Sequence, residues 1–396
     1  MPPLPMAPTG RQGSALPGAP TSSPAPAAAC LPDRALNRRS WLALGATLAA
    51  ATTGTLLADL TRPALAATAA ASATTPALQR PAVSTALGPR SVLQAVATAG
   101  DRLVAVGERG LILVSTNQGQ SWSQRPSPVS TGLTAVRFAD AQRGVAVGHG
   151  GVVLATADAG QTWRQLLDGV RAAALLREAA QASGEPAALQ SAERLVADGP
   201  DKPWLDVLMP GPDQLRVVGA YGLALASDDA GKTWRRWLKP ADNPKELHLY
   251  AIRQRGAQWL IAGEQGTVLH SSDGGQNFRR LTLPYNGSFF TAELPADGSL
   301  LVAGLRGNAW RSTDGGATWQ ALTTPVPVSF TASAQQTDGR VLLANQAGMV
   351  LSLEADGRLQ PLPLPPQPPL TALLPLAGDQ LLALSIQGAQ RLSLGR

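Results

Sequence analysis

The amino-acid sequence predicts an all-β fold, a closed β-propeller of seven blades. An octapeptide of the pattern Ser/Thr-x-Asp-x-Gly-x-Thr-Trp, an Asp-box, recurs at residues 115–122, 156–163, 227–234, 271–278 and 312–319. Each copy lies near the end of a longer unit of about 40 residues, a period typical of repeat architectures. Each unit contains four short apolar runs separated by turn residues, and this pattern is typical of a propeller blade.

The first element, residues 1–66, is predicted to be an N-terminal extension with an export signal. Arg38 and Arg39 precede an Ala-rich apolar run, and residues 64–66 form an Ala-x-Ala cleavage pattern. The paired arginines resemble a twin-arginine signal, and a general secretory signal is the alternative. Residues 67–77 form a linker to the propeller, residues 78–396. We therefore expect an exported, soluble periplasmic protein, a monomer.

Composition argues against nucleic acid as a partner. The formal net charge is +6, but without the first 66 residues the chain holds 28 basic and 25 acidic residues. No run of Lys and Arg interleaved with aromatic residues follows. The chain has three histidines and one cysteine, Cys30, which lies before the predicted cleavage site. We expect no metal, no cofactor and no small-molecule substrate.

Seven units follow the linker in order. The four-strand template fits residues 92–125, 133–166, 204–237, 247–281 and 288–322. It also fits 328–362, where the box is degraded to "SLEADGRL", and 370–394, where the fourth strand is missing. We predict that residues 78–88 supply this strand and close the ring, because an open propeller would leave two unpaired sheet edges.

The Asp-boxes are predicted to be structural. Each lies at the turn between the third and fourth strands, where a carboxylate can accept hydrogen bonds from backbone N–H groups further along the turn. The terminal aromatic ring can pack between blades. The residues concerned are Asn117, Asp158, Asp229, Asp273 and Asp314, followed by Trp122, Trp163, Trp234, Phe278 and Trp319. We assign no catalytic role to them.

One insertion interrupts the repeat, at about residues 167–200. It is rich in Ala, Leu, Glu and Arg, and Gly184 and Pro186 divide it. We expect two short helices between blades two and three. They are either a tolerated surface insertion or a lid or docking element.

Candidate partner-binding residues gather in the turns between second and third strands and in the loops between blades. Because these segments share one face of a propeller, their unusual side chains are expected to lie together. We expect five turn residues to occupy equivalent positions between paired glycines: Arg109, His149, Tyr221, Glu264 and Arg306. The loops add the remaining rings and amides. The candidate residues are Glu108, Arg109, His149, Tyr221, His248, Tyr250, Glu264, Tyr285, Asn286 and Arg306. Rings beside arginines are typical of protein contacts.

The same segments resemble a known family. The turns "VGERG", "VGAYG" and "AGEQG" and the loops "GPDKP", "HLYAIR" and "PYNGSFF", together with the boxes, are similar to the photosystem II stability/assembly factor family, in particular its proteobacterial periplasmic relatives. The resemblance implies a non-enzymatic seven-bladed propeller that binds a membrane protein complex. Arg109 and Arg306 match arginine-bearing turns, whereas His149, Tyr221 and Gln265 depart from them. For the proteobacterial branch the resemblance suggests an exporter of the resistance-nodulation-division type as client.

A secreted glycoside hydrolase of the sialidase type is the alternative, because such enzymes also carry Asp-boxes. It would need a Tyr nucleophile, for which Tyr250 or Tyr285 is available, and three arginines to hold a substrate carboxylate, for which Arg109, Arg253 and Arg306 are candidates. The Arg-Ile-Pro motif of that class is missing before the first box. The sequence therefore favours a non-catalytic assembly or accessory factor.

Overall fold

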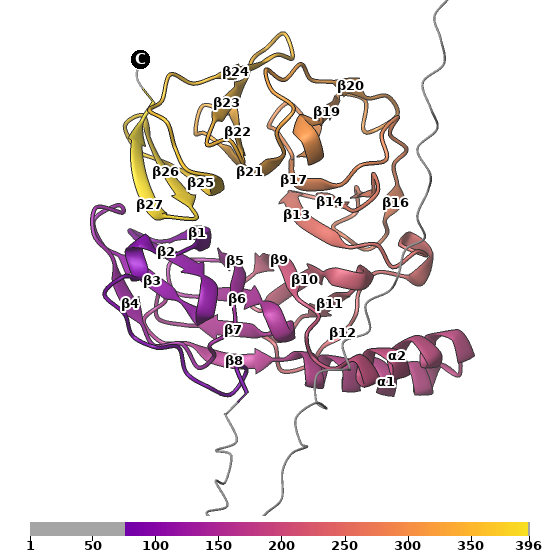
Figure 1. Ribbon diagram of the computed structural model, residues 1–396. Helices are drawn as coiled ribbons and strands as arrows, with labels where there is room; N and C mark the ends of the chain where they lie inside the picture. The colour runs from indigo at the N-terminus through magenta and orange to yellow at the C-terminus, as the bar shows by residue number, and fades with distance from the viewer. Residues whose placement is uncertain (1–75, 395–396) are drawn as a thin grey trace, which may run out of the picture. The chain divides into compact units, whose positions relative to one another are not determined.

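Seven antiparallel sheets surround a central channel in the computed structural model, which describes residues 76–394 (Figure 1). Six sheets have four strands in chain order, and the seventh has three. The seven-bladed propeller is thus confirmed. The predicted export signal, residues 1–66, and most of the predicted linker lie outside the described residues.

The strands keep chain order within each blade, as short hairpin connections dictate. Blades one and two comprise β1 (Leu93–Ala99), β2 (Arg102–Gly107), β3 (Ile112–Ser115), β4 (Ser123–Arg125), β5 (Leu133–Phe138), β6 (Gly144–Gly148), β7 (Val153–Thr156) and β8 (Arg164–Leu167). Blades three and four comprise β9 (Trp204–Gly211), β10 (Gln214–Gly219), β11 (Ala224–Ser227), β12 (Arg235–Arg236), β13 (Leu249–Arg255), β14 (Gln258–Gly263), β15 (Val268–Ser271) and β16 (Arg279–Arg280). Blades five to seven comprise β17 (Phe289–Glu293), β18 (Leu300–Gly304), β19 (Ala309–Ser312), β20 (Gln320–Ala321), β21 (Phe330–Gln335), β22 (Val341–Asn345), β23 (Val350–Leu353), β24 (Leu359–Pro361), β25 (Leu370–Leu376), β26 (Gln380–Ser385) and β27 (Gly388–Ser393).

The first strand of each blade lines the channel and begins with a large apolar residue. This residue is fully buried in every blade, so it anchors the strand in the core. The seven are Leu93, Leu133, Trp204, Leu249, Phe289, Phe330 and Leu370.

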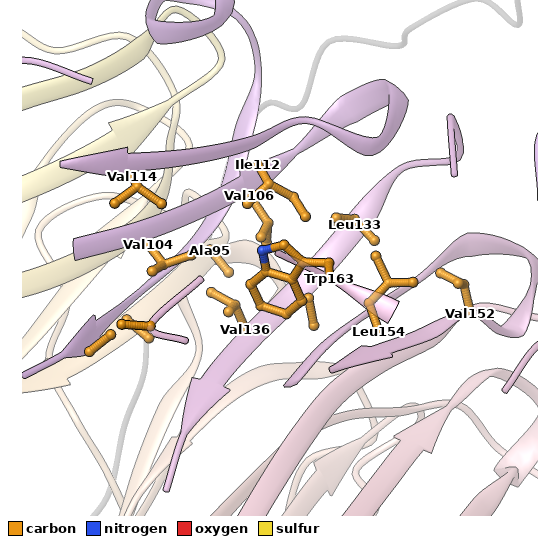
Figure 2. Close-up of a cluster of buried hydrophobic side chains, with 14 of the residues drawn as sticks. Ala95, Val104, Val106, Ile112, Val114, Leu133, Val136, Val152, Leu154 and Trp163 are labelled. Atoms are coloured by element: carbon orange, nitrogen blue, oxygen red, sulfur yellow. The ribbon is translucent and has the colours of Figure 1, made fainter. Parts of the chain in front are cut away.

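The box aromatics pack between neighbouring blades, as predicted. Trp163 follows β7 of blade two, yet its ring lies against Val104, Val106 and Ile112 of blade one (Figure 2). Trp122 packs in the same way against blade seven, and the other box rings do so at three further interfaces. Each box thus joins its blade to the preceding one.

The predicted closure of the ring by residues 78–88 is wrong. Blade seven keeps three strands, and no residue of 78–88 is in a strand. The segment instead runs along blade one, where Ala82 N donates to Ser127 O and Gln124 Nε2 donates to Val83 O. The segment therefore covers β4 of blade one, and its end, at Gly88–Arg90, contacts β27.

Closure comes from packing between blades seven and one. Leu382 and Leu384 of β26 share a buried cluster with Leu93 and Leu103 of blade one. Thr371 Oγ1 donates to Leu93 O at 2.6 Å, and the equivalent bond joins Thr134 Oγ1 to Trp204 O between blades two and three. The last interface is therefore built like the others.

The insertion is a helical hairpin, as predicted, formed by α1 (Gly169–Ser183) and α2 (Pro186–Asp198). Asp168 caps α1 by accepting from Arg171 N, and Gly184 in the left-handed region ends it. Leu176 packs into the core between blades two and three. In Figure 1 the hairpin lies at the rim of the ring beside β8 and β12.

Candidate functional site

One face of the ring is formed by the turns between second and third strands and by the loops that lead into the first strands; we call it the turn face. In every blade the turn is tied to the loop by a backbone hydrogen bond to the residue just before the first strand. The donors are Glu108, His149, Ala220, Glu264, Leu305, Gln346 and Ile386, and the acceptors are Val92, Gly132, Pro203, His248, Ser288, Ser329 and Pro369. The expected sharing of one face is therefore correct.

Two glycines in these turns are required for different reasons. Gly219 has extended backbone, and a Cβ there would meet Pro203 O at 2.3 Å, so the close strand approach demands glycine. Gly222 has a φ of +66°, in the left-handed region that glycine adopts without strain. The position between Ala220 and Gly222 is variable from blade to blade: it holds Arg109, Gly150, Tyr221, Gln265 and Arg306 in blades one to five.

The exposed residues of the turn face occupy that variable position in blades one, three and five. Arg109, Tyr221 and Arg306 are exposed and have φ values of 55°, 56° and 56°. Left-handed backbone costs a side-chain-bearing residue roughly 1–2 kcal/mol. Ala159 and Ala230 in the boxes adopt it as well, so this strain alone is no mark of function.

His149 and Glu264 do not share this position, which corrects the expected equivalence of all five. Each occupies the preceding turn position, beside Gly150 and Gln265 respectively. His149 is exposed, as is Glu108 at the same position of blade one. Glu264 is half-buried, and its Oε2 accepts from His248 N at 3.2 Å. Glu264 thus fixes a loop as well as facing solvent.

An aromatic row, formed by Tyr221, His248, Tyr250 and Phe290, runs from the turn of blade three into the channel mouth. The ring centroids are 5.0, 6.1 and 5.2 Å apart in that order. His248 Nδ1 also accepts from Tyr221 N at 2.8 Å. Burial, and secondarily the charge of Glu264, raises the pKa of Tyr250, which is half-buried. Tyr221 is the exposed end of the row, with 53% of its surface accessible.

Tyr285 stabilises the turn of blade five more than it offers a contact surface. Its hydroxyl donates to Leu305 O at 3.1 Å, and its ring stacks on Trp310. Burial raises its pKa, and nearby Arg306 opposes that rise. Asn286 beside it is exposed.

Sequence reasoning missed three residues of this face. Leu305 and Ile386 are large apolar side chains with 36% and 45% of their surface exposed in the turns of blades five and seven. The turn of blade seven lacks the paired-glycine pattern, so only its place after the second strand could have identified Ile386. Lys202, in "GPDKP", lies with its ammonium 5.1 Å from the centre of the Tyr221 ring.

The channel holds a belt of paired charges. Asp206, buried at a position that is alanine in five other first strands, accepts from Arg253 at 2.6 Å and from Arg137 at 3.3 Å. Glu293 lies 3.8 Å from Arg253 and accepts from Gln335. Burial lowers the pKa of Arg137; it would do the same for Arg253, but Asp206 and Glu293 raise that pKa overall.

These pairs bear on the hydrolase alternative. Arg253 is held by two carboxylates inside the channel, whereas Arg109 and Arg306 belong to turns of blades one and five. The three arginines named for a substrate carboxylate therefore come from different settings, and one is already neutralised by ion pairs.

The box carboxylates accept hydrogen bonds on the opposite face, as predicted. Asp158 Oδ1 accepts from the backbone N–H groups of Gln161 and Thr162, and Oδ2 accepts from the Thr162 hydroxyl at 2.6 Å. Asp229, Asp273 and Asp314 are bound in the same manner. Asn117 accepts from Ser121 N and donates to its hydroxyl. Within residues 76–394, no group of three or more His, Cys, Asp or Glu could hold a metal ion.

A family model matches part of the chain. The model described as photosynthesis system II assembly factor YCF48 matches residues 187–355. That range covers α2 and most of blades three to six. Among curated proteins there is no match.

Solved structures share the fold of the whole ring. One described as YCF48 bound to D1 peptide has a TM-score of 0.58 at 17% identity, covering 82% of this chain and all of that one. YCF48 from Cyanidioschyzon merolae has a TM-score of 0.57 at 14% identity, covering 77% and 96%. A GH74 xyloglucanase from Xanthomonas campestris has a TM-score of 0.56 at 13% identity, covering 78% of this chain and 53% of that enzyme. No helix of the described part of the chain is long and apolar enough to cross a membrane.

Proposed function

Taking as premise that this chain is a seven-bladed propeller like those of the photosystem II assembly factor family, we propose that it is a non-catalytic assembly or accessory factor for a membrane protein complex. The turn face is its binding surface. One observation carries the proposal: equivalent turns of the ring hold three exposed side chains, Arg109, Tyr221 and Arg306.

These side chains suit a protein contact. Tyr and Arg are enriched among residues that dominate binding energy, and rigid turns lower the entropy lost on binding. Leu305 and Ile386 add exposed apolar surface on the same face. The boxes on the other face have their carboxylates engaged by their own turns, so they offer less to a partner.

The partner class follows from the relatives. A YCF48 structure is described as bound to D1 peptide, which supports a segment of a membrane protein as the ligand of this chain too. We propose periplasmic action, based on Arg38, Arg39 and the cleavage pattern at 64–66. Within that compartment, an exporter of the resistance-nodulation-division type is the client we favour, on the resemblance to the proteobacterial branch.

The test is recovery of membrane partners by the tagged full-length protein. Three variants test the turn face: Arg109→Ala, Tyr221→Ala and Arg306→Ala. If the side chain is central to the contact, each variant should bind the partner with about 30-fold or more lower affinity and recover correspondingly less of it. Lys232→Ala, an exposed change in a box of the opposite face, is the matched control. Melting temperatures should stay close to the parent's, since within residues 76–394 none of the three side chains makes a hydrogen bond or an ion pair.

Unchanged recovery by all three variants would refute the turn face as binding surface. Turnover of a sialoside or of xyloglucan by the purified protein would refute a non-catalytic role. The xyloglucanase fold match makes the second substrate a necessary control.

A further inference from the structure

A cavity of about 510 Å³ lies between the helical hairpin and blade three, at the edge of the turn face, to which Tyr221 and Lys202 also belong. Its volume falls in the range of roughly 300–1,000 Å³ found for ligand sites. Helices α1 and α2 form one wall, and β12 with the loop at 238–246 forms the other. The function proposed above does not use the rest of this cavity.

The cavity has an apolar lining. Leu176 of α1 and Leu195 of α2 face Leu223 and Leu238 across it. Leu176 and Leu238 are buried, whereas Leu195 and Leu223 are only partly so. Apolar side chains of a ligand would therefore gain burial there.

The charged lining is unbalanced. Four basic residues, Arg194, Lys202, Arg236 and Lys239, stand against two acidic ones, Asp198 and Glu246. Both acids are already engaged inside the protein: Asp198 pairs with Lys202 at 3.4 Å, and Glu246 accepts from the Ser191 hydroxyl at 3.0 Å. The excess is positive.

Two guanidinium groups are left available. Among residues 76–394, Arg194 and Arg236 make no side-chain hydrogen bond or ion pair, although Arg235 next to Arg236 pairs with Asp228. Arg194 lies on α2 and Arg236 on β12, so the two charges come from opposite walls. Guanidinium groups bind carboxylates in a bidentate manner.

We propose that this cavity binds an extended acidic peptide segment of a partner protein, with carboxylates at Arg194 and Arg236 and an apolar side chain among the leucines. Alternate side chains of an extended peptide point to opposite sides, which matches charges on two walls with an apolar region between. The hairpin is then a docking element. The inference does not rest on the turn-face proposal, although Tyr221 borders both sites.

The test uses the full-length protein and an array of acetylated, amidated octapeptides in which two acidic residues, Glu or Asp, flank a pair of Leu or Val residues. The two acids are three positions apart, so their side chains point to opposite sides of the extended peptide. Each peptide has a twin with Gln for Glu and Asn for Asp. We expect acidic members to bind better than their twins, and binding to weaken as salt is raised. Arg194→Gln with Arg236→Gln should weaken it about tenfold.

Arg177→Gln is the matched control, because Arg177 is an exposed arginine of the same hairpin that does not line the cavity. It should leave peptide binding unchanged, and so should Arg109→Ala with Arg306→Ala, which separates this site from the turn face. Equal binding of acidic peptides and twins, or equal binding by the double variant, overturns the proposal. Full competition by N-acetylglutamate at the peptide's own concentration also overturns it, in favour of a small-acid site.

Discussion

At the scale of single residues, the box carboxylates connect local turn chemistry to the behaviour of the whole ring. Hydrogen bonds from Thr233, from its hydroxyl first and its backbone N–H second, lower the pKa of Asp229 to about 2. Asn277 lowers the pKa of Asp273, and Thr318 that of Asp314, by equivalent bonds. In each of these bonds a carboxylate oxygen of the Asp is the acceptor, so protonation of that carboxylate weakens the bonds.

Acid should therefore weaken the fold through the boxes. The folded pKa values lie below the unfolded value of about 3.9, so the stabilisation is fully present above pH 4 and is lost as the pH falls toward 2. We predict that changing Asp229, Asp273 and Asp314 together to Asn removes part of this loss. Melting temperatures of both proteins between pH 7 and pH 2 measure it.

Asn117 supports the choice of Asn as replacement, because in this box an amide side chain already holds the turn through its hydrogen bonds to Ser121. The triple variant should be folded at pH 7, with a flatter decline below pH 4. A parallel decline in both proteins would show that other carboxylates, such as Asp140, set the acid limit.

The sequence predicts these residues well because box chemistry is local. Every partner of Asp158 lies within four positions of it. The aromatic row was not predictable in the same way, since it joins Tyr221 to His248 and Tyr250 to Phe290 across blades. Asp206 escaped notice for the same reason, as its arginines are 69 and 47 positions away.

At the scale of elements, the hairpin is an addition to a ring that is complete without it. Gly169 and Pro200 lie against each other, since a Cβ on Gly169 would be 2.3 Å from Pro200 O. The chain therefore leaves the ring and returns to it at the same point. The sequence predicted the two helices from composition and breakers, but not the cavity, which depends on how the hairpin packs on blade three.

We predict that replacing residues 170–199 with a short Gly-Ser linker leaves the propeller folded. Strand signals in circular dichroism should persist, and the melting temperature should fall by only a few degrees, because Ala172 and Leu176 lose their contacts with the core. Binding of the acidic octapeptides should disappear, while recovery of membrane partners should be retained. Failure to fold would show that the hairpin is part of the core.

At the scale of the whole molecule, the ring closes by packing rather than by a shared sheet. Because blade seven has three strands, the outer edge of β27 is unpaired among the described residues. The other six blades end in a fourth strand, and no pattern in residues 78–88 could distinguish a strand there from a segment that runs along blade one. An unpaired edge is ordinarily a liability.

This edge predicts the outcome of a circular permutation. We consider a linker that joins Leu394 to Gly88 and replaces residues 76–87. It must run back along β27, which is six residues long. There it would take the place of the missing fourth strand. About ten residues span that length. With new ends between Pro325 and Val326, outside any blade, we expect a folded ring that melts no lower than the unpermuted chain lacking residues 76–87.

The decisive comparison is between two linkers of equal length. One alternates Thr and Val, which favour strands, and the other places Pro at every second position, which removes the N–H groups that a ladder requires. If the linker pairs with β27, the first permutant should melt several degrees above the second. Equal melting temperatures would mean that the edge of blade seven gains nothing from a fourth strand, and that interblade packing by Leu93, Leu382 and Leu384 is sufficient for closure.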